Sequence, residues 1–122
     1  MVLEPDGSPA PISPVFGNEL FGGGFGITPN ADGSQIYIGN FGWGTEEYMP
    51  EYGSISVFDS DGNASGMSCY QPLMRMTCNV IDKVGNLWAT NNWKPDFPND
   101  VTDNPGGDGV VIFVGVAKPK TL

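Results

Sequence analysis

The chain has 122 residues, a formal net charge of −9 at pH 7, two cysteines and no histidine. The absence of histidine removes the usual general base and the commonest zinc or iron ligand, while the acidic balance without a basic stripe argues against nucleic-acid binding. The apolar stretches are too short to span a membrane as helices. Hydrophobic residues make up 39% of the chain, which is enough for the core of one domain.

Short segments of alternating apolar and polar residues run through the chain, and turn-forming residues separate them. Glycines preceded or followed by Asp or Asn, at Gly33, Gly62 and Gly85, predict tight turns between consecutive strands. Two longer segments, 41–52 and 92–108, predict loops. Because no helical periodicity competes with this pattern, the sequence predicts an all-β fold. The predicted strands cover residues 25–28, 35–40, 54–59, 66–71, 76–81, 87–91 and 109–116.

Parts of this pattern recur about 51 to 55 residues further along the chain. The run ADGSQIYIGN at 31–40 is echoed by KVGNLWATN at 83–91, and GSISVF at 53–58 is echoed by DGVVIF at 108–113. Repeats of this length indicate units that cannot bury their faces alone and that stack on neighbours. The sequence therefore predicts a repeat architecture.

Longer runs within these repeats carry a resemblance to a known fold. GITPNADGSQIYIGN at 26–40 with GSISVFD at 53–59 resembles one blade of an NHL-type β-propeller, and VIDKVGNLWATNNW at 80–93 is similar to the same blade. GGDGVVIFVGVAKP at 106–119 resembles the C-terminal blade of bacterial NHL and streptogramin-lyase-like propellers. The resemblance covers nearly the whole chain and implies four antiparallel strands in each blade.

The resemblance implies that residues 1–122 form a single partial β-propeller domain. Residues 1–21 would supply outer strands of a preceding blade, residues 22–73 one blade and residues 74–122 a second. A complete ring needs four to eight blades, so we expect missing blades or further copies of the chain to complete it. Three copies would supply about six blades, which makes a homotrimer the first expectation.

The long segments 41–52 and 92–108 are the first candidates for a ligand face, because loops on a rigid scaffold often carry function. They combine carboxylates with aromatic side chains, which suit a carbohydrate, another small molecule or a peptide. We therefore expect a self-assembling binding or scaffold module. The alternative is that the aromatic residues cap the sheets and the acidic residues keep the chain soluble. The candidate ligand-binding residues are Trp43, Tyr48, Tyr52, Trp93 and Phe97.

Asn40 and Asn91 end matching strands of the two repeats and are the candidate metal ligands. In gluconolactonase-like and paraoxonase-like propellers, asparagine and carboxylate residues of this region bind a catalytic calcium, an ion that prefers oxygen ligands. The resemblance therefore suggests a second function, a calcium-assisted hydrolase or lactonase at the channel of an assembled ring. The alternative is that both asparagines bond to neighbouring backbone groups. Streptogramin lyases depend on a catalytic histidine, which this chain lacks.

Cys69 and Cys78 lie nine residues apart and match no metal-binding spacing. They are either two buried small hydrophobes or a disulfide across a turn, which needs an oxidising compartment. The resemblance implies an extracellular or periplasmic location, although residues 1–6 lack the basic start and apolar run of a signal peptide.

Overall fold

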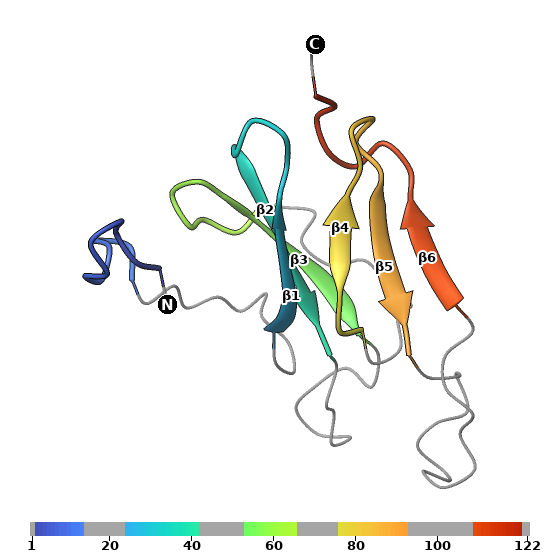
Figure 1. Cartoon of the computed structure of the whole chain (residues 1–122), viewed down its shortest axis with the longest axis horizontal. Coiled ribbons are helices and arrows are strands. Elements are labelled where there is room, and N and C mark those ends of the chain that lie inside the picture. The colour runs from blue at the N-terminus through green and yellow to red at the C-terminus, as the bar shows by residue number, and fades with distance from the viewer. Residues whose placement is uncertain (1, 14–23, 42–52, 66–75, 93–108, 121–122) are drawn as a thin grey trace, which may run out of the picture.

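The computed structural model of the chain describes residues 2–13, 24–41, 53–65, 76–92 and 109–120. These residues form two three-stranded antiparallel sheets, and no helix occurs among them. The strand order follows the chain in both sheets, so each is a simple meander (Figure 1). The prediction of an all-β fold is confirmed. The first sheet contains β1 (Gly24–Pro29), β2 (Gln35–Asn40) and β3 (Ser54–Asp59), and the second contains β4 (Asn79–Ile81), β5 (Leu87–Asn91) and β6 (Gly109–Phe113).

Three strands, β2, β3 and β5, have the bounds that the alternating sequence predicts. The other three differ at their ends. β1 is one residue longer at each end and contains a register shift between Gly24 and Gly26. β6 ends at Phe113 instead of residue 116, because the chain turns at Gly115, which has a φ of 67°. Glycine adopts this left-handed conformation without the steric cost that other residues have.

The predicted strand 76–81 is shortened to β4, which begins at Asn79. The reason lies in the hydroxyl of Thr90 on the neighbouring strand. The backbone N–H groups of Thr77 and Cys78 donate to this hydroxyl oxygen at 3.3 Å and 3.2 Å. A side chain therefore takes the place of the backbone acceptor that a longer strand would use.

The predicted strand 66–71 lies outside the described residues, but the chain before it already turns back along β3. The Ser65 N–H donates to the Val57 carbonyl at 2.8 Å, and Phe58 and Ala64 form an antiparallel bridge. A returning segment therefore begins at the free edge of the first sheet, on the side of β3 that faces away from β2.

Aspartate residues organise the hairpin turns. At the turn between β4 and β5, Asp82 Oδ1 accepts the backbone N–H groups of Val84 and Asn86, and Gly85 has a φ of 89°. The turn after β3 repeats this arrangement around Asp59. Carboxylates that accept backbone N–H groups at a turn compensate for donors that the strands leave unpaired. These residues therefore have a structural role in the fold.

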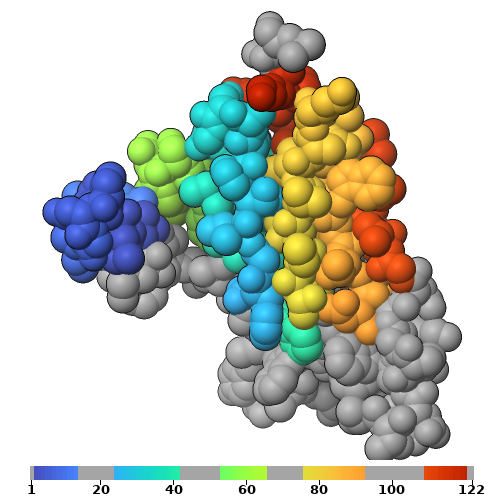
Figure 2. All heavy atoms as spheres, viewed as in Figure 1, coloured from blue at the N-terminus to red at the C-terminus, as the bar shows by residue number. Residues whose placement is uncertain are grey.

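The two sheets pack against each other through one face of each. We call the face that carries Tyr37 in the first sheet, or Trp88 in the second, its front face, and the opposite face its back face. The front face of the first sheet packs on the back face of the second, and β1 and β4 lie side by side (Figure 2). The buried core consists of Tyr37, Ile55, Val57, Met76, Leu87, Ala89 and Ala117.

Two glycines on the front face of the first sheet allow this close approach. A Cβ atom on Gly26 would overlap the side chain of Asn79, and one on Gly39 would overlap the end of Met76. The Asn79 side chain also donates a hydrogen bond from Nδ2 to the Tyr37 carbonyl at 3.2 Å. The missing side chains thus leave the space into which the second sheet packs.

Residues 116–120 tie the two sheets together beside their turns, and we call them the C-terminal strap. The Tyr37 hydroxyl of the first sheet donates to the Val116 carbonyl at 2.7 Å. On the second sheet, the N–H of Ala117 donates to the Gly85 carbonyl at 3.1 Å, and the N–H of Lys120 to the Lys83 carbonyl at 2.9 Å. The strap therefore contacts both repeats at the same end of the molecule.

The remaining described segment, residues 2–13, forms a small hairpin of its own, in which Leu3 and Pro9 are bridged. The assignment of residues 1–21 to a preceding blade stays a prediction. Cys78 is an exposed free thiol, so the alternative of two buried cysteines is wrong for this residue, and Cys69 lies outside the described residues. Within the described part of the chain, no helix is long and apolar enough to cross a membrane.

Candidate functional site

The predicted aromatic ligand site lies outside the described residues. Trp43, Tyr48 and Tyr52 belong to residues 42–52, and Trp93 and Phe97 belong to residues 93–108. The strands on which these segments are anchored are described. β2 and β5 end, and β3 and β6 begin, at the same end of the two sheets (Figure 1). Both segments therefore leave the scaffold from one end, as the repeat predicts.

Asn40 is completely buried and holds two serine hydroxyls. Its Nδ2 donates to Ser54 Oγ at 3.1 Å and to Ser56 Oγ at 2.7 Å, across the pair of strands β2 and β3. Its Oδ1 has no hydrogen-bond partner among the described residues. The amide nitrogen of Asn40 thus donates to side-chain hydroxyls, whereas the alternative expectation was a hydrogen bond to backbone groups.

The described residues around Asn40 do not fit a calcium ion. Calcium takes six to eight oxygen ligands, usually with carboxylates among them, whereas this cluster offers one amide and two hydroxyls. No group of three or more acidic, cysteine or histidine residues among the described residues could hold a metal ion. Asn91, the second candidate ligand, is half-buried on the other sheet, opposite Gly109. The calcium prediction gains no carboxylate ligand from this part of the chain.

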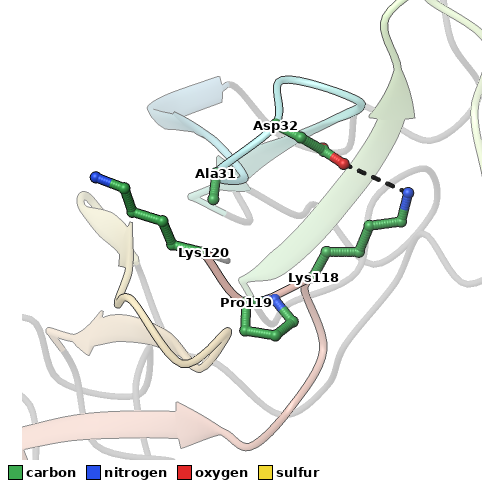
Figure 3. Close-up of a pocket in the computed structure, with 5 residues that line it drawn as sticks. All are labelled: Ala31, Asp32, Lys118, Pro119 and Lys120. Carbon is green, nitrogen blue, oxygen red and sulfur yellow. Dashed lines mark hydrogen bonds and ion pairs between the residues drawn. The ribbon is translucent and has the colours of Figure 1, made fainter. Parts of the chain in front are cut away.

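A surface hollow of about 380 Å³ lies between the turn after β1 and the C-terminal strap (Figure 3). Asp32 and Lys118 approach each other across it at 3.4 Å, while Lys120 extends away from that pair. Both partners are at least half exposed, and such exposed ion pairs contribute little to stability. The residues that line the hollow are Ala31, Asp32, Lys118, Pro119 and Lys120.

The Asp32 carboxylate serves the turn rather than a ligand. Its Oδ1 accepts both the hydroxyl and the backbone N–H of Ser34 at 2.5 Å and 3.0 Å. The hydrogen bond from the Ser34 hydroxyl, followed by that from the backbone N–H, lowers the pKa of Asp32 from 3.8 to about 2. The carboxylate is therefore held in its charged form by local structure, and the hollow offers a ligand few groups that are not already used.

The front face of the second sheet carries a group of exposed apolar side chains. Trp88 lies between Val80 of β4 and Ile112 of β6 in the register of the sheet. Their side chains are exposed by 40%, 55% and 44%. Val110, on the same face of β6, is exposed by 56%. A row of large apolar side chains across three strands marks an interaction surface more often than scattered apolar residues do.

A hydrogen bond fixes the indole of Trp88 on this face. Its Nε1–H donates to Asp82 Oδ2 at 2.9 Å, from the strand to the turn before it. This bond, together with the backbone N–H of Asn86, lowers the pKa of Asp82 from 3.8 to about 2. The ring is thus held in place while its apolar surface stays accessible, as in surfaces that are ready to bind.

Trp88 and Asp82 were not among the residues predicted from sequence, although a signal for them exists. The alignment of the repeats places Trp88 at the position of Tyr37, a core residue of the first sheet.

Comparison with models of known protein families, with curated proteins and with solved structures found no match to this chain. The function is therefore argued from these residues alone.

Proposed function

We propose that this chain is a two-unit repeat scaffold of the NHL β-propeller type that associates with further copies of itself. The observation that carries the proposal is the exposed front face of the second sheet. The equivalent face of the first sheet is buried by the next unit of the same chain, with Tyr37 1% exposed and Trp88 40% exposed. A unit whose apolar face has no neighbour in the chain needs one from elsewhere.

The energy available from such a neighbour is substantial. Full burial of an Ile or Val side chain contributes about 1.5–3 kcal/mol relative to exposure. Four apolar side chains of the front face, those of Val80, Trp88, Val110 and Ile112, are at least 40% exposed. Their combined burial favours association strongly enough to offset part of the entropy that association costs.

We further propose that the assembled scaffold presents residues 41–52 and 92–108 as a ligand face. The shared anchoring of both segments at one end of the sheets supports this, because repetition of the unit would place further copies of them around the same end. Their aromatic side chains suit a carbohydrate or a peptide. No observation in the described residues favours the alternative of a calcium-assisted hydrolase.

Native mass spectrometry tests the self-association. We expect a discrete oligomer, with three copies and therefore six units as the first expectation, and a mass that does not change when calcium is removed with a chelator. A chain that remains a 13.0 kDa monomer at micromolar concentration would contradict the proposal.

Ligand binding is tested separately by tryptophan fluorescence. We expect soluble oligosaccharides or peptides to change the emission of the wild-type chain and to have no effect on a Trp43→Ala/Trp93→Ala double variant. A Val84→Ala variant serves as the matched control, since Val84 is an exposed residue of the turn between β4 and β5, at the opposite end of β5 from Asn91. An equal response from all three proteins would exclude the two tryptophans from the site.

A further inference from the structure

Two backbone hydrogen bonds fold the chain back along β3. The Ser65 N–H donates to the Val57 carbonyl at 2.8 Å, on the edge of β3 that faces away from β2. The Asp59 N–H donates to the Asn63 carbonyl at 2.9 Å, and Gly62 lies in the turn with a φ of 82°. The first sheet therefore carries the beginning of a fourth strand on its outer edge.

The hairpin at residues 2–13 contains the same two bonds at earlier positions of the chain. The Ala10 N–H donates to the Val2 carbonyl at 3.0 Å, and the Glu4 N–H donates to the Ser8 carbonyl at 2.8 Å. Gly7 lies in the turn with a φ of 87°. Each residue stands 55 positions before its counterpart at the β3 turn, as from 10 to 65 and from 2 to 57. The hairpin therefore has the form of the returning turn of a repeat.

The second sheet has no such returning segment among the described residues. Ile112 of β6 occupies the position of Val57 in β3, so its carbonyl points to the outer edge of the sheet, away from β5. After β6 the chain turns at Gly115, whose N–H donates to Asn86 Oδ1 at 3.0 Å. The C-terminal strap then bonds to the turn between β4 and β5 instead of returning along β6. The outer edge of β6 lies on the opposite side of the molecule from the N-terminal hairpin (Figure 1).

The hairpin is a weak partner for its own returning segment. Residues 2–9 are all exposed, and the side chains of Val2 and Leu3 are 37% and 52% exposed. A two-stranded hairpin on its own is marginally stable in water, whereas the edge of a sheet is a template for pairing with a further strand. Residues 8–10 would therefore gain stability by exchanging residues 2–4 for the edge of a larger sheet.

The repeat specifies which atoms would meet in such an exchange. Residues 2–4 correspond to residues 57–59 and, a further 55 positions on, to residues 112–114 of the second sheet. The Ala10 N–H would donate to the Ile112 carbonyl, and the Val114 N–H would donate to the Ser8 carbonyl. Pro9 has no N–H, and its position uses none in the hairpin. The number of backbone bonds is thus kept when the partner changes.

We propose that residues 8–10 of one copy of this chain pair with the outer edge of β6 in a second copy and begin the fourth strand of that sheet. This inference rests on the proposed self-association and specifies one contact that links the copies. The partner is a second copy, because the hairpin lies across the molecule from β6 of its own chain (Figure 1). Each copy supplies one N-terminal segment and one edge, so the contact joins two different surfaces.

The test removes one backbone N–H from each side of the contact. Ala10→Pro removes the donor of the N-terminal segment, and Val114→Pro removes the donor of the β6 edge. For half-assembly, we expect each variant to need about tenfold more protein than the wild type, because an acceptor is left without its hydrogen bond. Light scattering over a dilution series measures this concentration.

Matched controls keep the N–H groups and change the same side chains. Ala10→Gly and Val114→Ala are expected to assemble like the wild type. Val114 is 80% exposed and does not belong to the four apolar residues of the front face, so these variants leave that face intact. Circular dichroism checks that each variant is folded. Ala10 lies outside both sheets, so Ala10→Pro tests the contact even if Val114→Pro does not fold.

A mixture of the two proline variants tests whether the segment and the edge meet each other. Ala10→Pro keeps an intact β6 edge, and Val114→Pro keeps an intact N-terminal segment. An equimolar mixture is therefore expected to form a dimer of one chain of each kind at the concentration at which the wild type assembles. Native mass spectrometry identifies this dimer.

A further variant tests whether residues 2–4 must be displaced. Glu4→Pro removes the N–H that bonds to the Ser8 carbonyl and weakens the hairpin, but it leaves the Ala10 N–H in place. If residues 8–10 exchange partners, this variant should assemble at a lower concentration than the wild type. Loss of assembly would show that the intact hairpin is required and would overturn the exchange.

The remaining outcomes contradict distinct parts of the proposal. A wild type that stays monomeric would overturn the self-association itself. Assembly of both proline variants at the wild-type concentration would leave the self-association standing and overturn the choice of segment and edge. A mixture that assembles no better than either variant alone would overturn the pairing of the one with the other. Equal losses in the proline variants and their controls would exclude backbone pairing as the cause.

Discussion

The front faces of the two sheets are built alike and end up in opposite environments. On the first sheet, Tyr37 and Ile55 lie in the core of the molecule. On the second, Trp88 and Val110 occupy the corresponding positions and are exposed. The difference shows that a repeat's sequence specifies a surface for packing, while the presence of a neighbouring unit decides whether that surface is buried.

Shortening the side chains of Ile55 and Val110, which occupy corresponding positions on the two front faces, should give the largest difference in stability. Ile55→Ala should lower the free energy of unfolding by about 2–5 kcal/mol, because it opens a cavity in the core. Val110→Ala should lower it by less than about 0.5 kcal/mol, the usual range for an exposed position. Both are measured by urea denaturation at a protein concentration low enough that association does not contribute. Equal losses would show that the second front face is covered within the chain.

A glycine between the two packed sheets should give the next largest loss of stability when it is replaced. Gly39→Ala should lower the free energy of unfolding by about 1–3 kcal/mol, because its new Cβ overlaps Met76 in the packed core. The matched variant Gly33→Ala changes a turn glycine that has open space around it but a φ of 73°. It reports the cost of backbone conformation alone. A Gly39→Ala variant as stable as the wild type would mean that the sheets do not approach closely there.

Removing the hydroxyl of Tyr37 should have a smaller effect on stability, and it tests how the C-terminal strap holds the two sheets together. Tyr37→Phe should lower the free energy of unfolding by about 0.5–1.5 kcal/mol, because it removes the hydrogen bond to the Val116 carbonyl. Hydrogen exchange should rise at the Ala117 amide, the strap's first bond to the second sheet. No change at that amide would separate the two bonds and contradict a strap that acts as one unit.

The smallest expected effect is a change in stability with pH, and it arises from the Asp82 carboxylate beside Trp88 on the exposed front face. The pKa of Asp82 is about 2 in the folded chain and 3.8 without its local hydrogen bonds, of which the one from Trp88 is the strongest. Because the folded pKa is the lower one, the carboxylate stabilises the fold fully above pH 3.8 and loses this effect as the pH falls towards 2. The NMR shift of the Trp88 indole proton should follow a midpoint near pH 2. A midpoint near 3.8, or a midpoint unchanged in Asp82→Asn, would exclude the bond.

Local sequence signals predict much of this fold. β2, β3 and β5 are bounded by Asp-containing turns and alternate in polarity, so their limits can be inferred from the sequence. The burial of β2 is different. Its alternation has two apolar faces, with Ile36 and Ile38 on one and Tyr37 on the other, and only the position of the second sheet determines that Tyr37 is the more buried. Periodicity gives the faces of a strand and leaves the choice of neighbour to tertiary packing.

The candidate sites are predicted less well than the strands. Asn40 and Asn91 do lie at matching strand ends, but Asn40 bonds to serines of β3 and has no carboxylate beside it in the described structure. The alignment of the repeats marks Trp88 as the counterpart of Tyr37, but the sequence does not indicate that Trp88 is exposed, because an aromatic residue in a strand usually marks a core position. Exposure depends on which surface packs against a face, and a single repeat does not encode that surface.

The C-terminal strap has a consequence for how the chain folds during synthesis. A ribosome releases the strands of both sheets before it releases residues 116–120, and domains fold from the N-terminal side as they emerge. The bonds from Tyr37 to Val116 and from Lys120 to Lys83 join the two packed sheets at one end, and they can form only after the six described strands have been made. The front face of the first sheet therefore stays uncovered until the second sheet has been made, and the bonds of the strap form after the two described sheets.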